Sequence, residues 1–207
     1  GGLVGQSEGN LRAVIQTCEA IAPCVLWIDE IEKAFAGSKS SGMTDGGTSS
    51  RVFGSFLSWM QEKKSPVFVV ATANDVTQLP AEFLRKGRFD ELFFLDLPNP
   101  QEREAIWGIQ IAKYGRKPKG YNLGALSIGS EGFTGAEIEQ AFIEGLYEGF
   151  AKGKEPDTVG LGAILAKQVP LSRLMGEQIA ALRQWATGRA RPATSPLPGM
   201  NTRKIAA

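Results

Sequence analysis

Two carboxylates stand directly after a short apolar run in the segment CVLWIDE, where Asp29 and Glu30 follow Cys24–Ile28. Carboxylate oxygens suit a hydrated Mg²⁺ ion that bridges phosphates, and a second carboxylate can orient or deprotonate an attacking water. The same pair could instead do no more than stabilise the N-terminus of a following helix, which favours negative charge. The acid pair by itself leaves both interpretations open.

An amide side chain stands at the end of a second apolar run, where Asn74 follows Val67–Ala73. In parallel α/β sheets, ligands bind beyond the carboxyl ends of the strands, so we expect Asp29, Glu30 and Asn74 to converge on one edge. Asn also commonly ends a strand in an ordinary turn. Together the three side chains meet the needs of nucleoside triphosphate hydrolysis, in which positioning and charge neutralisation supply most of the catalysis.

Two arginines, Arg85 and Arg88, lie in the segment FLRKGRFDE, shortly before a third apolar run. A guanidinium is planar, permanently charged and suited to phosphate. An arginine presented to a phosphate in a neighbouring subunit would act there as a finger in trans. The alternative is that both are solvated loop charges.

The elements that must position these side chains alternate along the chain. Apolar spacing predicts a helix over 7–22, with Ser7 as its N-cap. The run Cys24–Ile28 shows no alternation, so we expect a strand covered on both faces. The other elements predicted in this part are helices at 51–62, 80–85 and 101–113 and strands at 67–73 and 91–97.

The composition changes after residue 113, and the remaining elements are predicted to be helices, at 134–150, 158–167 and 172–187. Thr134 and Glu137 have the spacing of a capping box. The fold class is therefore α/β, with a parallel-sheet core followed by a small helical subdomain. The predicted divisions are a core over 1–113, a helical lid over 114–188 and a disordered tail over 189–207, which contains Pro and Gly and no apolar stripe.

The overall composition excludes several classes of function. Apolar residues make up 43% and charged residues 22% of the 207 residues, as in globular proteins, and the net charge of +1 gives no bulk attraction to nucleic acid or to a membrane surface. No apolar run approaches the length that spans a bilayer. The chain contains no histidine, which removes imidazole catalysis and His–metal sites. Cys18 and Cys24 are interpreted as buried thiols of a reducing compartment.

Three segments resemble blocks of the AAA ATPase family, in the family's order: CVLWIDEIEKAF, VFVVATANDVTQLPAEFLRKGRFDELFFLDLP and GFTGAEIEQA. They are similar to the Walker B strand, the second region of homology and the lid motif. The resemblance covers about residues 1–175. GGLVGQSEGNLR and APCVLWIDEIEK further resemble AAA proteins encoded in plastid genomes and cyanobacteria. The implied fold is the AAA+ core of the P-loop NTPase type with a C-terminal helical lid.

The resemblance implies a role for each matching residue. Asp29 would be the Walker B acid of the magnesium site, and Glu30 would be the catalytic glutamate. Asn74 would be the sensor of the γ-phosphate of ATP. Arg85 and Arg88 would be the arginine fingers.

Further positions match the lid and the pore loops of the family. Gly135 and Ala136 correspond to lid positions near the nucleotide base and sugar, although they also suit a plain helix start. The first pore loop corresponds to Leu3-Val4-Gly5, and residues 36–50 would contain or adjoin the second. The leucine stands where polypeptide-threading members carry an aromatic residue, so threading is not implied.

The phosphate-binding loop G-x-x-x-x-G-K-[ST] is absent from the sequence. In the family it would lie upstream of Gly1, so we interpret the chain as truncated at its N-terminus, before the first pore loop. Without that loop the isolated chain is expected to lack ATPase activity. Lys86 also departs from the family, which usually has Pro at this position.

The function that follows is an AAA-type ATPase that couples MgATP hydrolysis to remodelling of a protein partner within a homo-oligomeric ring, a hexamer. Its expected location is the cytoplasm or the plastid stroma. The alternative is a non-hydrolysing nucleotide-sensing or scaffolding protein with the same fold. A nucleic-acid motor is a weaker option, because the sequence shows no basic stripe.

Overall fold

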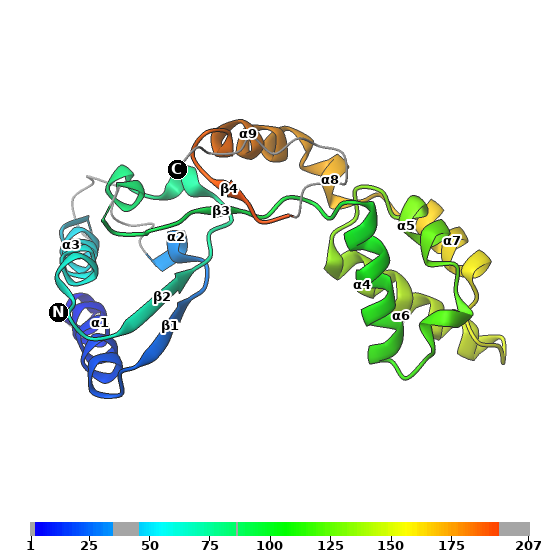
Figure 1. The fold of residues 1–207 in the computed structure, drawn as a ribbon, viewed down its shortest axis with the longest axis horizontal. Coiled ribbons are helices and arrows are strands. Elements are labelled where there is room, and N and C mark those ends of the chain that lie inside the picture. The colour runs from blue at the N-terminus through cyan, green and yellow to red at the C-terminus, as the bar shows by residue number, and fades with distance from the viewer. Residues whose placement is uncertain (1–2, 35–45, 86, 195–207) are drawn as a thin grey trace, which may run out of the picture. The chain divides into compact units, whose positions relative to one another are not determined.

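The computed structural model describes residues 3–34, 46–85 and 87–194, and for residues 3–8, 34, 46–51 and 53 it describes the backbone alone. The chain divides into two units, Gly1–Leu92 and Phe93–Ala207. Each unit has a hydrophobic core of its own. Figure 1 shows the elements of both units.

The first unit contains one parallel strand pair and the helices around it. Its elements are α1 (Leu3–Ala20), β1 (Cys24–Ile28), α2 (Ile31–Ala34), α3 (Gly46–Glu62), β2 (Val67–Ala71), and the 3-10 helices η2 (Val76–Gln78) and η3 (Ala81–Leu84). β1 and β2 pair in parallel, with Ile28 opposite Ala71. The helix predicted at 7–22 begins at Leu3, so Ser7 lies inside α1 and is not its N-cap.

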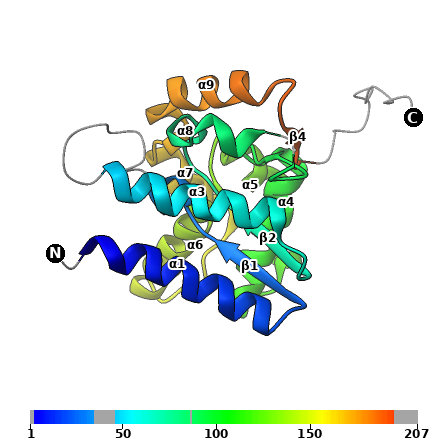
Figure 2. The same ribbon diagram turned by 90° about the vertical axis from the view of Figure 1, so that its left-hand side faces the viewer.

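Helices α1 and α3 run side by side in the first unit (Figure 2). The indole Nε1 of Trp59 in α3 donates to Glu19 Oε1 in α1 at 3.0 Å. The core of this unit consists of a buried set, Ile31, Val52, Phe56, Leu57, Met60, Leu79 and Phe83, against which the strand residues Leu26, Ile28, Val69 and Ala71 pack.

The opposite face of the strand pair is open to solvent. Val25 and Phe68 lie opposite each other in the register, and both are exposed, as is Trp27. The expectation that Cys24–Ile28 is covered on both faces is therefore wrong for this structure. The reason is that the described core packs against only one face of the pair.

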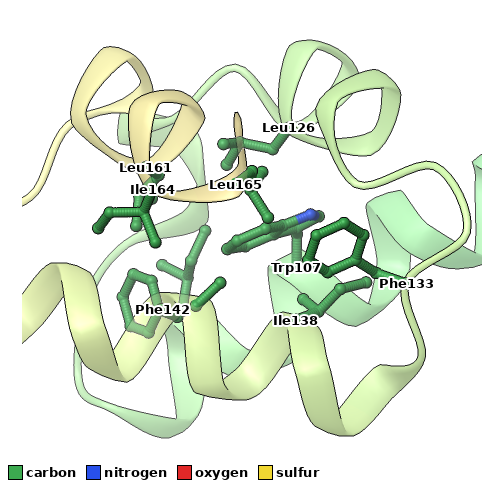
Figure 3. Packing of buried hydrophobic residues seen from close by; sticks show 10 residues of the cluster. Trp107, Leu126, Phe133, Ile138, Phe142, Leu161, Ile164 and Leu165 are labelled. Carbon is green, nitrogen blue, oxygen red and sulfur yellow. The ribbon is translucent and has the colours of Figure 1, made fainter. Parts of the chain in front are cut away.

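The second unit is mainly helical. Its elements are β3 (Phe93–Phe94), α4 (Pro100–Lys113), η4 (Pro118–Gly120), α5 (Leu123–Gly129), α6 (Gly135–Ala151), α7 (Thr158–Lys167), α8 (Leu171–Leu174), α9 (Gly176–Ala186) and β4 (Arg191–Pro192). Figure 3 shows its core, in which Trp107 lies among Leu126, Phe133, Ile138 and Leu165. None of the described helices in either unit is long and apolar enough to cross a membrane.

Capping boxes define the starts of two helices in this unit. The predicted box of Thr134 and Glu137 is confirmed at the start of α6, and Glu137 Oε1 also accepts the Leu171 N–H at 2.7 Å. A second box, which we did not predict, joins Asn99 and Glu102 ahead of α4. These caps satisfy N–H groups that have no partner within the helix.

The observed division of the chain differs from the boundary predicted after residue 113. It falls after Leu92, because α4 contributes the fully buried Trp107 and Ile111 to the core of the second unit. The strand predicted at 91–97 is limited to Phe93–Phe94. It pairs with Arg191–Pro192, which belongs to the tail predicted to be disordered.

We expect Phe142→Ala to lower the free energy of unfolding of the second unit by about 3–5 kcal/mol, because a large ring is removed from a close-packed core. Phe142 is 0% exposed and packs against the rings of Tyr114 and Tyr121. Urea unfolding, followed by circular dichroism and by hydrogen exchange of the α6 amides, measures the change.

Phe150→Ala is the matched control, since Phe150 lies on the same helix and is 89% exposed. This control should change the free energy of unfolding by less than about 0.5 kcal/mol. Equal losses for the two variants would contradict the packing described for α6.

Candidate functional site

The turn that follows β1 carries both acids of the predicted site. Asp29 is exposed and Glu30 is half-buried, and α2 begins at the next residue, Ile31. Glu30 has a φ of 48°, in the left-handed region that costs a residue with a side chain about 1–2 kcal/mol. Local contacts must therefore hold this backbone in place.

Thr72, the residue after β2, supplies those contacts. Its N–H donates to the Ile28 carbonyl and its carbonyl accepts the Ile31 N–H, each at 2.9 Å. Its Oγ1 accepts the Glu30 N–H at 3.0 Å and donates to Asp29 Oδ1. Thr72, directly after the end of β2, thus fixes the turn that carries Asp29 and Glu30.

The structure brings Asn74 into contact with the acid pair. Asn74 Nδ2 donates to Glu30 Oε1 at 2.8 Å. The Asn74 backbone N–H donates to Glu32 Oε1 at 3.1 Å, and Glu32 is only 6% exposed. Asn74 is therefore held by Glu30 through its side-chain amide and by Glu32 through its backbone N–H.

A cation lies beside the second oxygen of Glu30. Lys33 Nζ is 2.6 Å from Glu30 Oε2, and this hydrogen bond raises the pKa of Lys33 above its ordinary value. Both carboxylate oxygens of Glu30 therefore have partners. Because Lys33 is well exposed, water and salt weaken the pair, and it can open without a large cost.

The acids at this edge suit magnesium better than a metal held mainly by protein ligands. Among the residues that the structure describes, no group of three or more His, Cys, Asp or Glu side chains is arranged to hold a metal ion. Mg²⁺ usually keeps several waters and takes one or two carboxylates together with phosphate oxygens. An exposed Asp29, with Oδ1 oriented by Thr72, fits that mode of binding.

The two arginines occupy a separate turn after η3. Arg85 is exposed, and Arg88 is half-buried and donates through Nη1 to the Glu82 carbonyl. The turn is anchored by Phe89, whose ring stacks on the buried Phe83 with 6.1 Å between centroids. Among the described residues, neither arginine forms a hydrogen bond or ion pair with Asp29 or Glu30.

One of the two lid positions borders a cavity within the second unit. Gly135 begins α6 and is one of the residues around a mainly apolar cavity of about 570 Å³, whereas Ala136 is exposed. Asp96 on the cavity wall accepts a forked pair of bonds from Arg183 Nε and Nη2, each at 2.9 Å. Helix α9 is thereby tied to the segment that follows β3.

The first pore-loop match, Leu3-Val4-Gly5, forms the first residues of α1, and the description there covers the backbone alone. Residues 35–45 lie outside the described residues, so the predicted second pore loop is described only from Gly46, where α3 begins. The roles assigned to both loops stay predictions.

Comparison with known proteins places these features in a family. Residues 1–97 match the model of the "ATPase family associated with various cellular activities (AAA)". The chain is 52% identical over 196 residues to "Uncharacterized AAA domain-containing protein ycf46" of Pyropia yezoensis and 47% identical over 199 residues to the protein of the same name from Trieres chinensis. Each alignment covers 94% of this chain but 39% of the relative.

A solved structure gives the fold independently. The "Crystal structure of FIGL-1 AAA domain" superposes with a TM-score of 0.71 at 18% identity, covering 91% of this chain and 65% of the other. Residues 1–97 belong to the AAA family, and the fold is that of an AAA domain, with an α/β core and a helical lid. The predicted resemblance to the AAA family, and to AAA proteins encoded in plastid genomes, is confirmed.

The sequence did not single out Thr72 or Glu32. A signal for Thr72 exists in the register, since a pair that places Ile28 opposite Ala71 places Thr72 opposite Asp29. Without that register, Thr72 is an ordinary polar residue at the end of a strand. Glu32 was not predicted because, of the acids in this segment, only Asp29 and Glu30 match the Walker B pattern.

We expect Glu32→Ala to raise the hydrogen-exchange rate of the Asn74 backbone amide about tenfold or more, because a hydrogen bond to a charged acceptor contributes about 1.5–3 kcal/mol. Amide exchange followed by NMR measures it. Glu62→Ala, at the exposed end of α3, is the control and should leave this rate unchanged. An unchanged Asn74 rate in the Glu32 variant would show that this carboxylate does not hold the amide.

Proposed function

We propose that the protein binds MgATP, hydrolyses it, and uses the cycle to remodel a protein partner within a homo-oligomeric ring, a hexamer. The observation that carries this proposal is the hydrogen bond between Glu30 and Asn74 beside Asp29, in a chain with an AAA segment. The chain spans 39% of the length of the curated relatives. ATP hydrolysis and its coupling are therefore proposed for the full-length protein.

Each polar side chain at the edge has a proposed task. Asp29 would hold the waters of the magnesium ion, and the ion would neutralise charge on the phosphates. Glu30 would orient the attacking water and take its proton, once Lys33 has moved away from Oε2. Asn74 would hold Glu30 Oε1 with one hydrogen of its Nδ2 group. The other hydrogen would be directed toward the water or the terminal phosphate, so that base and water are within hydrogen-bond reach of each other.

The arginines are proposed to act on the site of a neighbouring subunit. Arg85 is exposed, and the Phe83–Phe89 stack fixes the turn that carries both side chains. A guanidinium presents a planar fork of donors that matches the geometry of a phosphate.

The remaining roles rest on the family. Gly135 and Ala136 are proposed to lie near the nucleotide base and sugar, and Leu3-Val4-Gly5 is proposed as the first pore loop. The partner is proposed to be a protein and not a nucleic acid, and the location is proposed to be the cytoplasm or the plastid stroma.

One observation favours a second candidate function. Both oxygens of Glu30 are engaged, by Asn74 and by Lys33, and these partners compete with an attacking water for the lone pairs of the carboxylate. A protein that kept this arrangement with nucleotide bound would sense ATP without hydrolysing it. Turnover by the full-length protein distinguishes the two functions.

We expect Glu30→Gln to bind MgATP but to lower kcat by about 10²–10⁴-fold, since the amide keeps the shape and loses the base. Asp29→Ala should instead weaken magnesium-dependent ATP binding. Phosphate release and equilibrium binding by the full-length protein measure the two effects, with Glu62→Gln as a surface control. Turnover of the Glu30 variant within a few-fold of wild type would exclude the role given to this carboxylate.

We expect Arg88→Ala, and likewise Arg85→Ala, to lower kcat by up to about 10³–10⁵-fold, the range known for arginine fingers, without unfolding the protein. Mixing Arg88→Ala subunits with Glu30→Gln subunits should restore turnover at interfaces that pair an intact acid with an intact finger. Arg173→Ala, an exposed arginine on α8, is the control.

The mixing experiment needs rings that contain both variants, which native mass spectrometry can verify. Persistent inactivity in verified mixed rings, at every ratio, would argue that the arginines act within their own subunit.

A further inference from the structure

The Thr72 side chain makes two hydrogen bonds to the acid pair. A hydroxyl has one hydrogen to donate and two lone pairs to accept. Here the hydrogen goes to Asp29 Oδ1, and one lone pair accepts the Glu30 N–H at 3.0 Å. The two bonds are compatible because they use different parts of the same group.

These bonds act on different properties of the two acids. The bond to Asp29 fixes the rotation of its carboxylate and leaves Oδ2 free to face a magnesium-bound water. The bond to Glu30 satisfies the N–H of a residue whose φ is 48° and so helps to hold a backbone conformation that is otherwise unfavourable. The backbone of Thr72 adds the bonds to Ile28 and Ile31 on either side of the turn.

We propose that Thr72 is a positioning residue for ATP hydrolysis: its hydroxyl sets the orientation of the magnesium-site carboxylate and the backbone of the catalytic glutamate together. This inference rests on the proposed function for its chemistry. The Thr72 hydroxyl bonds to both acids and is assigned no contact with ATP or with the attacking water. It acts only through Asp29 and Glu30.

Removing the hydroxyl should therefore alter both steps that depend on the acids. A freely rotating Asp29 carboxylate offers its oxygen to the magnesium waters less often, so more Mg²⁺ is needed. A Glu30 backbone without its acceptor places the side chain less accurately, so kcat falls. Loss of a group that orients a metal-site residue typically costs about 10–100-fold in metal affinity or activity.

Two matched pairs of side chains isolate the hydroxyl. Valine has nearly the shape of threonine without the hydroxyl, and alanine differs from serine by the hydroxyl alone. In the full-length protein, we expect Thr72→Val and Thr72→Ala to lower kcat by about 10–100-fold and to raise the half-saturating Mg²⁺ concentration by about tenfold. Thr72→Ser should stay within about threefold of wild type on both measures, since it keeps the bonding group.

A further readout does not depend on nucleotide. In the nucleotide-free protein, the hydrogen-exchange rate of the Glu30 amide should rise about tenfold in Thr72→Val and Thr72→Ala and stay near the wild-type value in Thr72→Ser. Thr17→Val is the control, because the Thr17 hydroxyl bonds only to the Ala13 carbonyl within α1. It should change neither the exchange rate nor the kinetics.

The outcomes separate this inference from the proposed function. If the wild-type protein hydrolyses ATP, and the Val and Ala variants keep its activity and its Glu30 exchange rate, then the role of Thr72 is overturned and the proposed function is not. Equal impairment of Ser and Ala variants also overturns it, since the hydroxyl would then not matter. An inactive full-length wild-type protein overturns the proposed hydrolysis. The exchange rates together with Mg²⁺-dependent ATP binding then decide whether Thr72 positions the two acids. If Thr72→Val does not fold, the Ser and Ala pair gives the same decision.

Discussion

The candidate site depends on the parallel pairing of β1 and β2 in one register. Parallel strands end at the same edge, and the register that places Ile28 opposite Ala71 brings Thr72 beside Asp29. Two residues further on, Asn74 reaches Glu30. A shift of one residue would turn the inward side chains outward and would separate the threonine from both acids. The chemistry of the edge is therefore a consequence of strand alignment.

That register is held by burial on one face of the strand pair. Leu26 and Ile28 pack on the core together with Val69 and Ala71 of the partner strand, and a slip of one residue in either strand would move its side chains out of this core. The opposite face, with Trp27 and its neighbours, adds nothing to this alignment because it is exposed. Packing between the strands and α3 thus fixes the geometry of side chains that lie at the solvent edge.

Local patterns predicted most elements and the members of the site, but not the contacts between them. Helical spacing and the capping box located α6, because such signals are contained within a few residues of sequence. The pairing of Phe93–Phe94 with Arg191–Pro192 joins segments almost a hundred positions apart, and no local signal reports it. The role of Thr72 was missed for the same reason, since it depends on which residue of another strand stands opposite. The boundary before α4 likewise required knowledge of where Trp107 packs.

The charge of the edge bears on which form of nucleotide the proposed site would accept. Asp29, Glu30 and Glu32 lie within four positions, and within the described part of the chain Lys33 forms an ion pair with Glu30. A free nucleoside triphosphate is a polyanion, and these carboxylates would repel it, whereas a triphosphate that carries Mg²⁺ presents a cation to Asp29. The acids would then select for the metal complex over the free nucleotide. Such selection requires that the carboxylates stay ordered while no cation is bound, and hydrogen bonds from Thr72 and Asn74 supply that order without neutralising the charge.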